Sequence, residues 1–212
     1  MSVINLSHRL TSSVEQFEQH KRLDGSLIYV DHEIEPGDGD ASLDLTVGEA
    51  WFRGSDSAYF KIEEDGLPLK PGQSCVVETN EEIGVPANAF GLVTGKGKYI
   101  FLGVLLSPGK MDPGFRQKLK IGLYNAGQKT VKFKRGEPFC TVCFLELEPS
   151  VDKLRSKGDL HPEARPVLRR FPTKQKLGVF LKEWAFLLSN LIALASLVIA
   201  AIVAWNRVAS NK

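Results

Sequence analysis

The stretch SLDLTVGEAWF, residues 42–52, is typical of most of this chain. It is rich in aliphatic and aromatic side chains, which favour extended strands. Turn signals rich in Gly, Pro, Asn and Asp recur at spacings of about 8–12 residues, as in an all-β sandwich or barrel. This texture runs from Leu27 to about Glu148 and excludes alternating βαβ units. The other expected strands are SLIYV, AYFKI, SCVVET, AFGLVTG, KYIFLGVLL, KLKIGLYN, TVKFK and FCTVCFLEL.

The segment before these strands predicts one short helix. Residues 12–15 read Ser-Ser-Val-Glu, the Ser-x-x-Glu pattern of an N-terminal capping box. Val14, Phe17 and Leu23 follow in a partly amphipathic pattern. We expect this helix to end near residues 24–25, where Asp-Gly follows.

The end of the chain has a different composition. Between Trp184 and Trp205 runs AFLLSNLIALASLVIAAIVA. This uncharged stretch of about 20 residues would cover roughly 30 Å as an α-helix, the thickness of a bilayer's hydrocarbon core. A buried core helix is the alternative, but such helices are usually shorter and carry a polar stripe. The sequence therefore predicts a transmembrane helix over residues 184–206 and a short tail over residues 207–212.

Basic residues gather just before this apolar run, in a polar segment that we interpret as a linker over residues 150–183. Lysine and arginine are enriched on the cytoplasmic flank of membrane helices. The first residues also lack the apolar region of a signal peptide. We therefore expect a single-pass membrane protein with a C-terminal anchor, a cytoplasmic N-terminal domain and the lipid bilayer as a partner. The basic residues are Lys153, Arg155, Lys157, Arg165, Arg169, Arg170, Lys174, Lys176 and Lys182.

Small residues recur along one face of the predicted anchor. Such a face lets membrane helices approach closely, although alanine and serine are also common in membrane spans. Asn190 lies beside this face and offers an amide for hydrogen bonds between helices. The residues of the face are Ser189, Ala193, Ser196, Ala200 and Ala204.

Composition excludes several other classes of function. A net charge of +2 argues against a dedicated nucleic-acid binder, so neither DNA nor RNA is an expected partner. Cys140 and Cys143 lie three apart on a predicted strand, where they face opposite sides and cannot chelate one metal together. The histidines fit no metal or triad spacing, so no protein metal site is predicted. They are His8, His20, His32 and His161.

A set of local motifs occurs in a characteristic order. This ordered set resembles the dCTP deaminase branch of the dUTPase fold over about residues 5–148. The resemblance implies a distorted β-barrel or jelly-roll-like subunit that assembles as a homotrimer, with nucleotide sites between neighbouring subunits. The motifs are Asp-Gly-Ser-Leu-Ile at 24–28, Ala-Ser-Leu-Asp-Leu-Thr-Val-Gly at 41–48, Leu-Lys-Pro-Gly at 69–72, Glu-Thr at 78–79, Gly-Val-Pro at 84–86, Gly-Leu-Val-Thr-Gly-Lys at 91–96, Met-Asp-Pro-Gly-Phe at 111–115, Leu-Tyr-Asn at 123–125 and Arg-Gly-Glu-Pro at 135–138.

Three positions that the resemblance assigns to deamination lack the required side chains. Deamination of cytosine needs a general acid–base, which is a glutamate in a Leu-Glu-Phe run of the family. The matching position here is Gly122, and the neighbouring Lys118 and Lys120 cannot replace a carboxylate. The family's Gly-Lys-Ser-Ser-Leu-x-Arg loop is matched by residues 95–101, where Gly97 stands at the hydroxyl position and the arginine is absent.

Pyrophosphate cleavage, the dUTPase activity, makes different demands. A carboxylate must orient a water and Mg²⁺ must bridge phosphate oxygens. Asp112 matches the family's water-binding aspartate, and Phe115 matches an aromatic residue that packs on deoxyribose. Asp-Pro-Gly is also a common turn, so a structural role for Asp112 stays open.

The remaining candidate site is the loop that contains two lysines. Gly95 and Gly97 alternate with Lys96 and Lys98, so the loop offers backbone N–H groups and positive charge to phosphates, with the hydroxyl of Thr94 beside it. It is equally compatible with a solvated hairpin tip.

Asp44 matches a supporting aspartate of the family, although a role in strand packing is the alternative. The sequence thus predicts a membrane-anchored, catalytically degenerate member that binds or senses a deoxynucleotide, with Mg²⁺ if a triphosphate binds. Two alternatives remain, namely an active tethered pyrophosphatase or deaminase and a trimeric structural protein.

Overall fold

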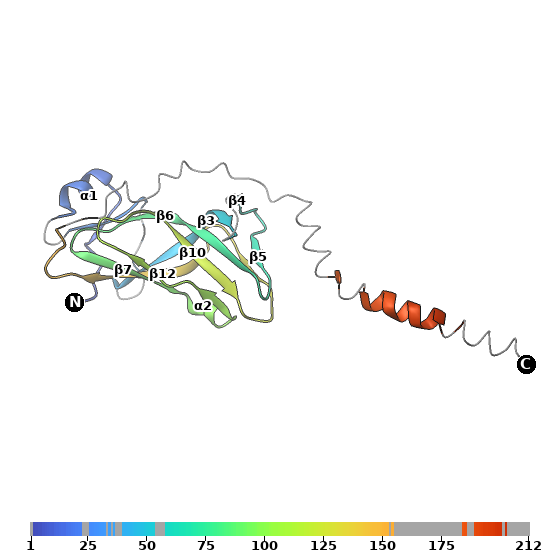
Figure 1. Cartoon of the computed structure of the whole chain (residues 1–212). Helices are drawn as coiled ribbons and strands as arrows, with labels where there is room; N and C mark the ends of the chain where they lie inside the picture. Colours follow the sequence, from blue (N-terminus) through green and yellow to red (C-terminus); the bar gives the residue numbers. More distant parts are fainter. Residues whose placement is uncertain are drawn as a thin grey trace, which may run out of the picture. The chain divides into compact units, whose positions relative to one another are not determined.

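The chain forms two compact units, Met1–Arg169 and Arg170–Lys212. The computed structural model describes residues 2–22, 26–32, 34, 36, 40–53, 58–152, 154, 184, 185, 189–200 and 202. The first unit is mainly β, as the sequence predicts (Figure 1). Its elements are β1 (Leu10–Thr11), α1 (Val14–His20), β2 (Ile28–Val30), β3 (Ser42–Phe52), β4 (Phe60–Lys61), β5 (Leu67–Leu69), β6 (Ser74–Gly84), β7 (Ala89–Gly95), α2 (Gly97–Ile100), β8 (Val104–Leu106), β9 (Gly109–Met111), β10 (Arg116–Asn125), β11 (Val131–Phe133) and β12 (Pro138–Glu146).

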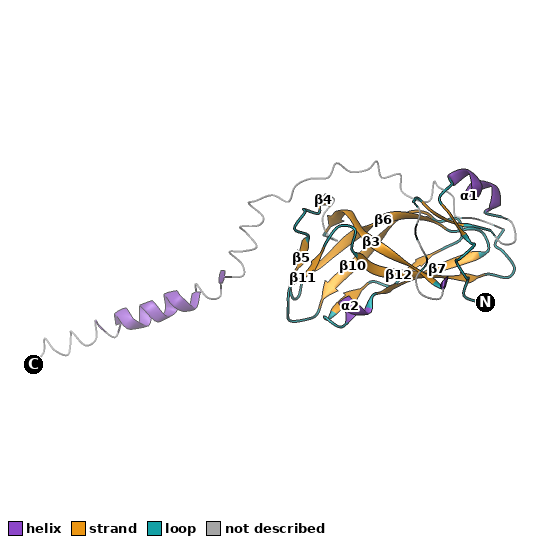
Figure 2. Ribbon diagram, turned by 180° about the vertical axis from the view of Figure 1, so that it is seen from behind, coloured by secondary structure: helices purple, strands orange, loops and turns teal. Residues whose placement is uncertain are grey.

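One long, curved sheet holds most of these strands (Figure 2). Its main order is β1-β2-β6-β3-β12-β7-β9, with β10 paired to both β6 and β8 and β4 paired to β3. Strands β5 and β11 form a separate antiparallel pair. Helix α1 lies at one end of this unit, and β4 and β5 lie at the other (Figure 1).

Strand β3 changes partner half-way along its length. Residues 42–46 pair with β12, whereas the part from Val47 to Phe52 pairs with β6. Gly48 lies where the pairing shifts, and a Cβ there would be 2.7 Å from the carbonyl oxygens of Glu78 and Thr79. A side chain would collide with the neighbouring backbone, so glycine lets the two strands approach at this point.

The chain also changes its pairing partner between β8 and β9. Strand β8 pairs with β10, whereas β9 pairs with β7, and only Ser107 and Pro108 lie between β8 and β9.

The sequence predicts one strand over KYIFLGVLL, residues 98–106, and this prediction is wrong. The chain instead forms α2, turns at Gly103 with φ +85°, and only then enters β8. Tyr99 explains the helix, because its buried ring stacks on Phe133 with centroids 4.7 Å apart.

Helix α1 begins one residue later than the predicted capping box, which places the N-cap at Ser12. Ser13 is the N-cap, and its side-chain oxygen accepts a hydrogen bond from the Gln16 N–H at 3.3 Å. The Gln16 side chain accepts a bond from the Thr11 hydroxyl at 2.7 Å. The helix ends at His20 rather than near residues 24–25. Ser12 and Ser13 are both suitable N-caps, and the hydrogen bonds around Thr11 favour Ser13.

The start and the exit of the β unit are joined. Residues 2–4 lie antiparallel to residues 144–146, with the Ile4 N–H donating to the Phe144 carbonyl at 2.8 Å and the Glu146 N–H donating to the Ser2 carbonyl at 2.8 Å. Beyond β12, the Val151 N–H donates to the Ala87 carbonyl at 3.1 Å. The N-terminal residues therefore hold the strand from which the C-terminal segment leaves.

The second unit is described in part. Residues 184, 185, 189–200 and 202 are helical, and their side chains are exposed. No helix in this described part of the chain, or in the described β unit, is long and apolar enough to cross a membrane. The predicted span also contains residues 186–188, 201 and 203–206, and the predicted linker contains residues 153 and 155–183. All of these lie outside the described residues, and they include Ala204 of the predicted contact face.

Candidate functional site

The Asp-Pro-Gly motif forms a turn. The Phe115 N–H donates to the Asp112 carbonyl at 3.0 Å, and Gly114 has φ +85°, as a type II turn requires at its third residue. Backbone hydrogen bonds between this turn and Val85 fix it against the residue that follows β6. The turn interpretation of Asp112 is confirmed, while its role in chemistry stays a prediction.

The side chains of this motif point to different environments. The Asp112 carboxylate is partly exposed and forms an ion pair with the Lys110 ammonium at 2.8 Å. Phe115 is buried, with 5% of its surface exposed. In this conformation of a single chain, Phe115 therefore contributes to the core rather than offering a face to a sugar.

The two lysines of the loop both contact carboxylates. The Lys96 ammonium donates to Asp44, and the Lys98 ammonium donates to Glu137. Asp44 also accepts a hydrogen bond from the Thr141 hydroxyl at 2.7 Å. Asp44 thus supports the loop, because it connects β3 and β12 to the start of α2.

These contacts change the ionisation of the carboxyl groups. Burial alone would raise the pKa of Asp44, but the hydrogen bonds from Lys96 and Thr141 hold the pKa below its usual value. The hydrogen bond from Lys98 likewise lowers the pKa of Glu137, and the same bond raises the pKa of Lys98. Both lysines are therefore charge-compensated, and a phosphate would have to displace a carboxylate to bind them.

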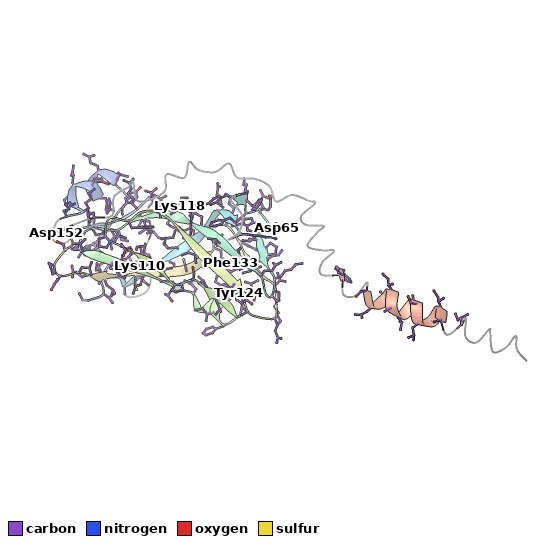
Figure 3. All side chains as sticks on the ribbon, in the orientation of Figure 1. Asp65, Lys110, Lys118, Tyr124, Phe133 and Asp152 are labelled. Atoms are coloured by element: carbon purple, nitrogen blue, oxygen red, sulfur yellow. The ribbon has the colours of Figure 1, made fainter. Side chains whose placement is uncertain are left out.

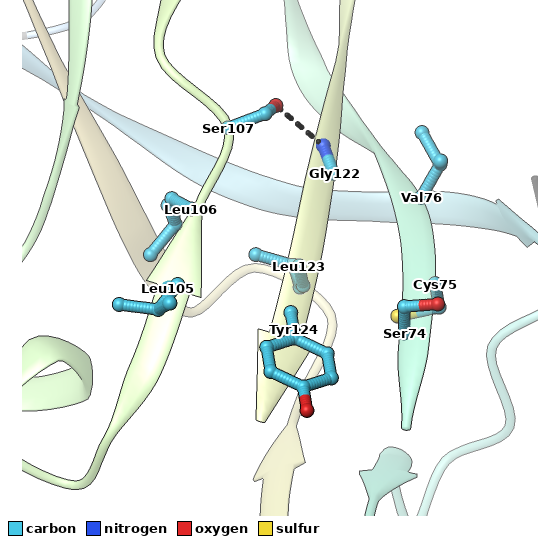
Figure 4. A pocket seen from close by; sticks show the side chains of 9 residues that line it. All are labelled: Ser74, Cys75, Val76, Leu105, Leu106, Ser107, Gly122, Leu123 and Tyr124. Carbon is cyan, nitrogen blue, oxygen red and sulfur yellow. Dashed lines mark hydrogen bonds between the residues drawn. The ribbon is translucent and has the colours of Figure 1, made fainter. Parts of the chain in front are cut away.

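Gly122 is bonded to Ser107 at the position where the resemblance requires a glutamate. The Ser107 hydroxyl accepts a hydrogen bond from the Gly122 N–H at 2.9 Å, and the Ser107 N–H donates to the Gly122 carbonyl at 2.8 Å (Figure 4). A Cβ at Gly122 would lie 3.2 Å from the Ser107 oxygen. The serine therefore occupies part of the space that a side chain at this position would need.

Gly122 lines a shallow hollow, which we call the β8 hollow (Figure 4). Its volume is about 380 Å³, near the lower end of the range for small-molecule pockets, ~300–1,000 Å³. Aliphatic and aromatic surface dominates the lining, and its polar groups are hydroxyls, a thiol and backbone. The lining residues are Ser74, Cys75, Val76, Leu105, Leu106, Ser107, Gly122, Leu123 and Tyr124.

A second hollow of about 210 Å³ lies beside the first and shares three of its residues, Leu105, Leu106 and Ser107. Thr94 and Gly95 line this smaller hollow. The structure therefore brings Thr94 and Gly95 near the Gly122 position, on both sides of β8. Six other predicted site residues line neither hollow, namely Asp44, Lys96, Gly97, Lys98, Asp112 and Phe115.

Sequence reasoning missed several residues of this region. Ser107 has only a weak sequence signal, since it lies in a Ser-Pro-Gly stretch that reads as a turn. Ser74 and Tyr124 lie at strand ends (Tyr124 is labelled in Figure 3), and nothing in their spacing marks a pocket. Phe101, which occupies the place of the arginine absent from the loop, is 89% exposed. A large apolar side chain in a predicted strand gave no sign that it would face solvent.

Metal and thiol chemistry have little support among the described residues. They hold no cluster of three or more His, Cys, Asp or Glu side chains suited to a metal ion. The single carboxylate of Asp112, paired with Lys110, does not fit a resident Mg²⁺ site, which leaves Mg²⁺ as a possible companion of nucleotide phosphates. Cys75 and Cys140 are free and buried, and burial raises the pKa of each to about 12.

Comparison with known proteins identifies the family. The model of the dCTP deaminase-like family matches residues 16–147. The chain is 33% identical to a dCTP deaminase of Pyrococcus abyssi, over 61% of this chain and 83% of that protein. It is 27% identical to a dCTP deaminase of Ignicoccus hospitalis, over 51% of this chain and 69% of that protein. The chain belongs to the dCTP deaminase-like family.

Solved structures give weaker likenesses. A dCTP deaminase from Agrobacterium tumefaciens is 17% identical with a TM-score of 0.46, covering 54% of this chain and 42% of that one. A dUTPase of equine infectious anaemia virus (EIAV) is 22% identical with a TM-score of 0.38, covering 55% of this chain and 96% of that one. The assignment to the family therefore rests on the sequence matches.

Proposed function

We propose that this protein is a membrane-attached member of its family that binds a deoxynucleotide or a related nucleotide without deaminating it. The Gly122–Ser107 pair is the observation that carries this proposal. A deaminase must move protons between an attacking water and the leaving amine, and a carboxylate of tuned pKa does this well. Glycine has no such group, and the hydroxyl of Ser107 accepts a bond from the backbone at this point.

The electrostatics of the β8 hollow support the same conclusion. No carboxylate, ammonium, guanidinium or imidazole group lines it. A hydroxyl cannot substitute for a glutamate as a proton acceptor near neutral pH, because only a group with a pKa near the working pH transfers protons efficiently in both directions. The hollow can hold a planar, largely apolar group, but it lacks the means to change that group chemically.

Nucleotide phosphates would bind at the adjoining loop in this proposal. Lys96 and Lys98 supply charge, Gly95 and Gly97 supply backbone N–H groups, and Thr94 supplies a hydroxyl. Binding would exchange the partners of the lysines, from Asp44 and Glu137 to phosphate oxygens. This exchange offers a physical route by which a bound ligand changes the contacts of α2.

Membrane attachment is supported by the helical residues of the second unit. Apolar side chains on this helix are exposed, with Leu197 at 70% and Ile192 at 66%. The Ser196 hydroxyl donates a hydrogen bond to the Ile192 carbonyl at 2.8 Å, so the polar group of Ser196 has a partner within its own helix. Helix pairing through Ser189, Ala193, Ser196, Ala200 and Ala204 remains part of the proposal, as does a cytoplasmic position for the β unit.

A second candidate function is metal-dependent pyrophosphate release. Asp112 favours it, because this carboxylate is partly exposed beside a tight turn and is available to orient a water. Its pairing with Lys110 weighs against it, since the ammonium competes for the same oxygens. A purely structural role, in which the β unit only assembles, makes no use of either Asp112 or the lysines.

A nucleotide panel separates these functions. Full-length protein in detergent is mixed with dCTP, dUTP and other nucleotides with Mg²⁺, and both thermal stability and products are measured. Binding without chemistry raises the melting temperature by mass action, while no uridine nucleotide forms from dCTP and no pyrophosphate is released from any nucleotide. Pyrophosphate release that disappears in Asp112→Ala would establish the second function, and formation of dUTP from dCTP would refute the proposal.

A further inference from the structure

Strands β5 and β11 form a two-stranded ribbon at one end of the β unit, with one face buried and the other exposed (Figure 2). Lys132 pairs with Pro68 across the two strands, and both side chains are exposed. Lys134 lies two residues further on and is also exposed, as is Lys129 in the turn that leads into β11. We call Lys129, Lys132 and Lys134 the lysine strip. The residues of the buried face are Leu67, Leu69, Val131 and Phe133.

The lysine strip carries positive charge that no described residue compensates. None of its three ammonium groups forms an ion pair with a residue in the described part of the chain. Lys96, Lys98 and Lys110, in contrast, each pair with a carboxylate. Arg135, which follows the strip in the sequence, pairs with Glu49 at 2.7 Å. The strip therefore differs from the other basic side chains beside it, because its charge is available to a partner.

Acidic residues adjoin this surface at its Lys134 end. A Cβ on Gly66 would lie 3.2 Å from the Lys134 side chain, and the Glu-Glu-Asp turn over residues 63–65 leads directly into Gly66. At the Lys129 end, neither residues 126–130 nor residues 70–73 contain an acid. The positive charge is therefore less opposed toward Lys129 than toward Lys134.

The backbone beneath the lysine strip is held rigidly. Asn125 is fully buried, and its side-chain amide donates to the carbonyls of Leu69 and Lys129, both at 2.8 Å. Phe133 is also fully buried and stacks on Tyr99 with ring centroids 4.7 Å apart. The lysines thus project from an ordered ribbon, so a partner would have to order only their side chains.

The chemistry of the lysine strip suits an extended anionic surface. Lysine is a hydrated point charge on a flexible stem, without the planar fork by which arginine grips a single phosphate or carboxylate. The three lysines line neither the β8 hollow nor the smaller hollow beside it, so they do not converge on the proposed nucleotide site. A net charge of +2 for the whole chain argues against nucleic acid as the partner. Anionic lipid head groups present many negative charges in one plane, and each nearby lysine is attracted to them.

We infer that the lysine strip docks the β unit on an anionic lipid surface. This inference rests on the membrane attachment proposed above, because an anchor would keep the β unit near a bilayer and so raise the effective concentration of lipid. Each lysine near an anionic surface favours docking by about fivefold, so three would favour it by roughly 100-fold at low salt. Lysine and proline also protect exposed strand edges from pairing with other chains, and the experiment separates that role from docking.

Energy transfer to labelled lipid tests this docking. Full-length protein carries a donor dye on Gln128→Cys, an exposed position beside the strip, in a Cys143→Ser background, since Cys75 and Cys140 are buried. It is reconstituted in vesicles of phosphatidylcholine alone or mixed with phosphatidylserine, with an acceptor dye on a lipid head group. We expect stronger energy transfer in the vesicles with phosphatidylserine, and a fall to the level of the neutral vesicles as salt screens the attraction.

A triple variant and a matched control assign the effect to the strip. Neutralising the strip is expected to lower the ratio of docked to free β units at least tenfold in the anionic vesicles. The control lowers the net charge by the same amount on α1, at the other end of the β unit, and is expected to change that ratio less than twofold. Both variants should keep the melting temperature of the parent protein. The triple variant is Lys129→Gln, Lys132→Gln and Lys134→Gln, and the control is Val14→Glu, Gln19→Glu and Lys21→Gln.

Several results would overturn the inference. These are equal energy transfer in the two kinds of vesicle, docking of the triple variant like that of the parent, and an equal loss in the α1 control. Aggregation of the triple variant with unchanged docking would show that the lysines only protect the strand edges. Binding of DNA or RNA through the strip, without docking on the anionic vesicles, would assign it to another partner.

Failure of the proposed anchor is distinguished by alkaline carbonate extraction of the same vesicles. A chain that resists extraction but does not dock refutes this inference and leaves the anchor standing. A chain that is extracted refutes the anchor, and the strip is then judged by flotation of that chain with each kind of vesicle. Flotation with the anionic vesicles alone, lost in the triple variant, would support docking, and its absence would refute it.

Discussion

Ser107 and Gly122 are joined by two hydrogen bonds, one in each direction, across the point where the chain leaves β8. The hydroxyl accepts from the Gly122 N–H at 2.9 Å and the Ser107 N–H donates to the Gly122 carbonyl at 2.8 Å. The side chain of Ser107 continues the pairing of β8 with β10 for one residue beyond the strand. Gly122, which the resemblance places at the family's glutamate position, is thus held in the sheet by Ser107.

Replacing Ser107 by alanine tests this structural role. The variant leaves the Gly122 N–H without its acceptor, which is expected to lower the free energy of unfolding by about 1 kcal/mol. Chemical denaturation measures the change, and Ser74→Ala is the control because it alters a hydroxyl in the same hollow. Equal stability for Ser107→Ala and the wild type would show that water satisfies this N–H equally well.

Gly127 is expected to tolerate no side chain. A Cβ there would lie 2.1 Å from the Leu102 carbonyl oxygen, so Gly127→Ala forces the turn after α2 and the β10–β11 turn apart and should cost about 1–3 kcal/mol. The control is Gly136→Ala, where φ is +73° but nothing lies within 4 Å of the added Cβ. That substitution carries only the backbone cost of a left-handed residue, about 1–2 kcal/mol. If both variants unfold alike, the contact between the turns is softer than its geometry indicates.

The ion pairs of Lys96 with Asp44 and of Lys98 with Glu137 predict that the stability of the fold falls at acidic pH. Asp44 and Glu137 have pKa values below their usual 3.8 and 4.5, so their stabilisation is present above those values and is lost as the pH falls through the lower folded pKa values. Urea denaturation from about pH 6 to about pH 3 should therefore show a steeper loss of stability in the wild type than in Asp44→Asn. Parallel curves for the two proteins would mean that the Lys96–Asp44 pair contributes nothing measurable.

The proposed anchor gives a prediction about charge. Leu194→Arg places a cation in the middle of the proposed span, which is expected to oppose insertion by about 2.5–3.5 kcal/mol. The full-length variant should be extracted from membranes by alkaline carbonate more readily than the wild type, while Leu194→Ile should behave as the wild type does. Complete extraction of the unaltered chain would contradict the proposed anchor.

The sequence was sufficient to predict the mainly β unit and its family, because strand runs and turn residues repeat over more than a hundred positions. The assignment of Gly122 to the position of the family's glutamate needs only a residue identity in a register, and it stays a prediction. Prediction from the sequence failed at KYIFLGVLL, where strand-forming residues enter a helix because Tyr99 finds its place on Phe133. Local preference was overruled there by a contact between residues far apart in the sequence.

The candidate site was less predictable than the fold. Lys96 and Lys98 look available to phosphate in the sequence, but their carboxylate partners come from β3 and from the turn before β12. Both carboxylates lie far from the loop in the sequence, so no local sequence pattern reveals these ion pairs. The hollow beside Gly122 likewise depends on three strands that meet only in the folded unit.

The pairing between residues 2–4 and β12 has a mechanical consequence for the anchoring that we propose. A pull on the C-terminal segment would reach β12 through Val151, which is hydrogen-bonded to Ala87, and β12 is held at that end by residues 2–4. Tension would have to shear several backbone bonds together before this strand detached. A bulky fusion at the N-terminus would weaken that resistance, whereas one placed in the β10–β11 turn would not.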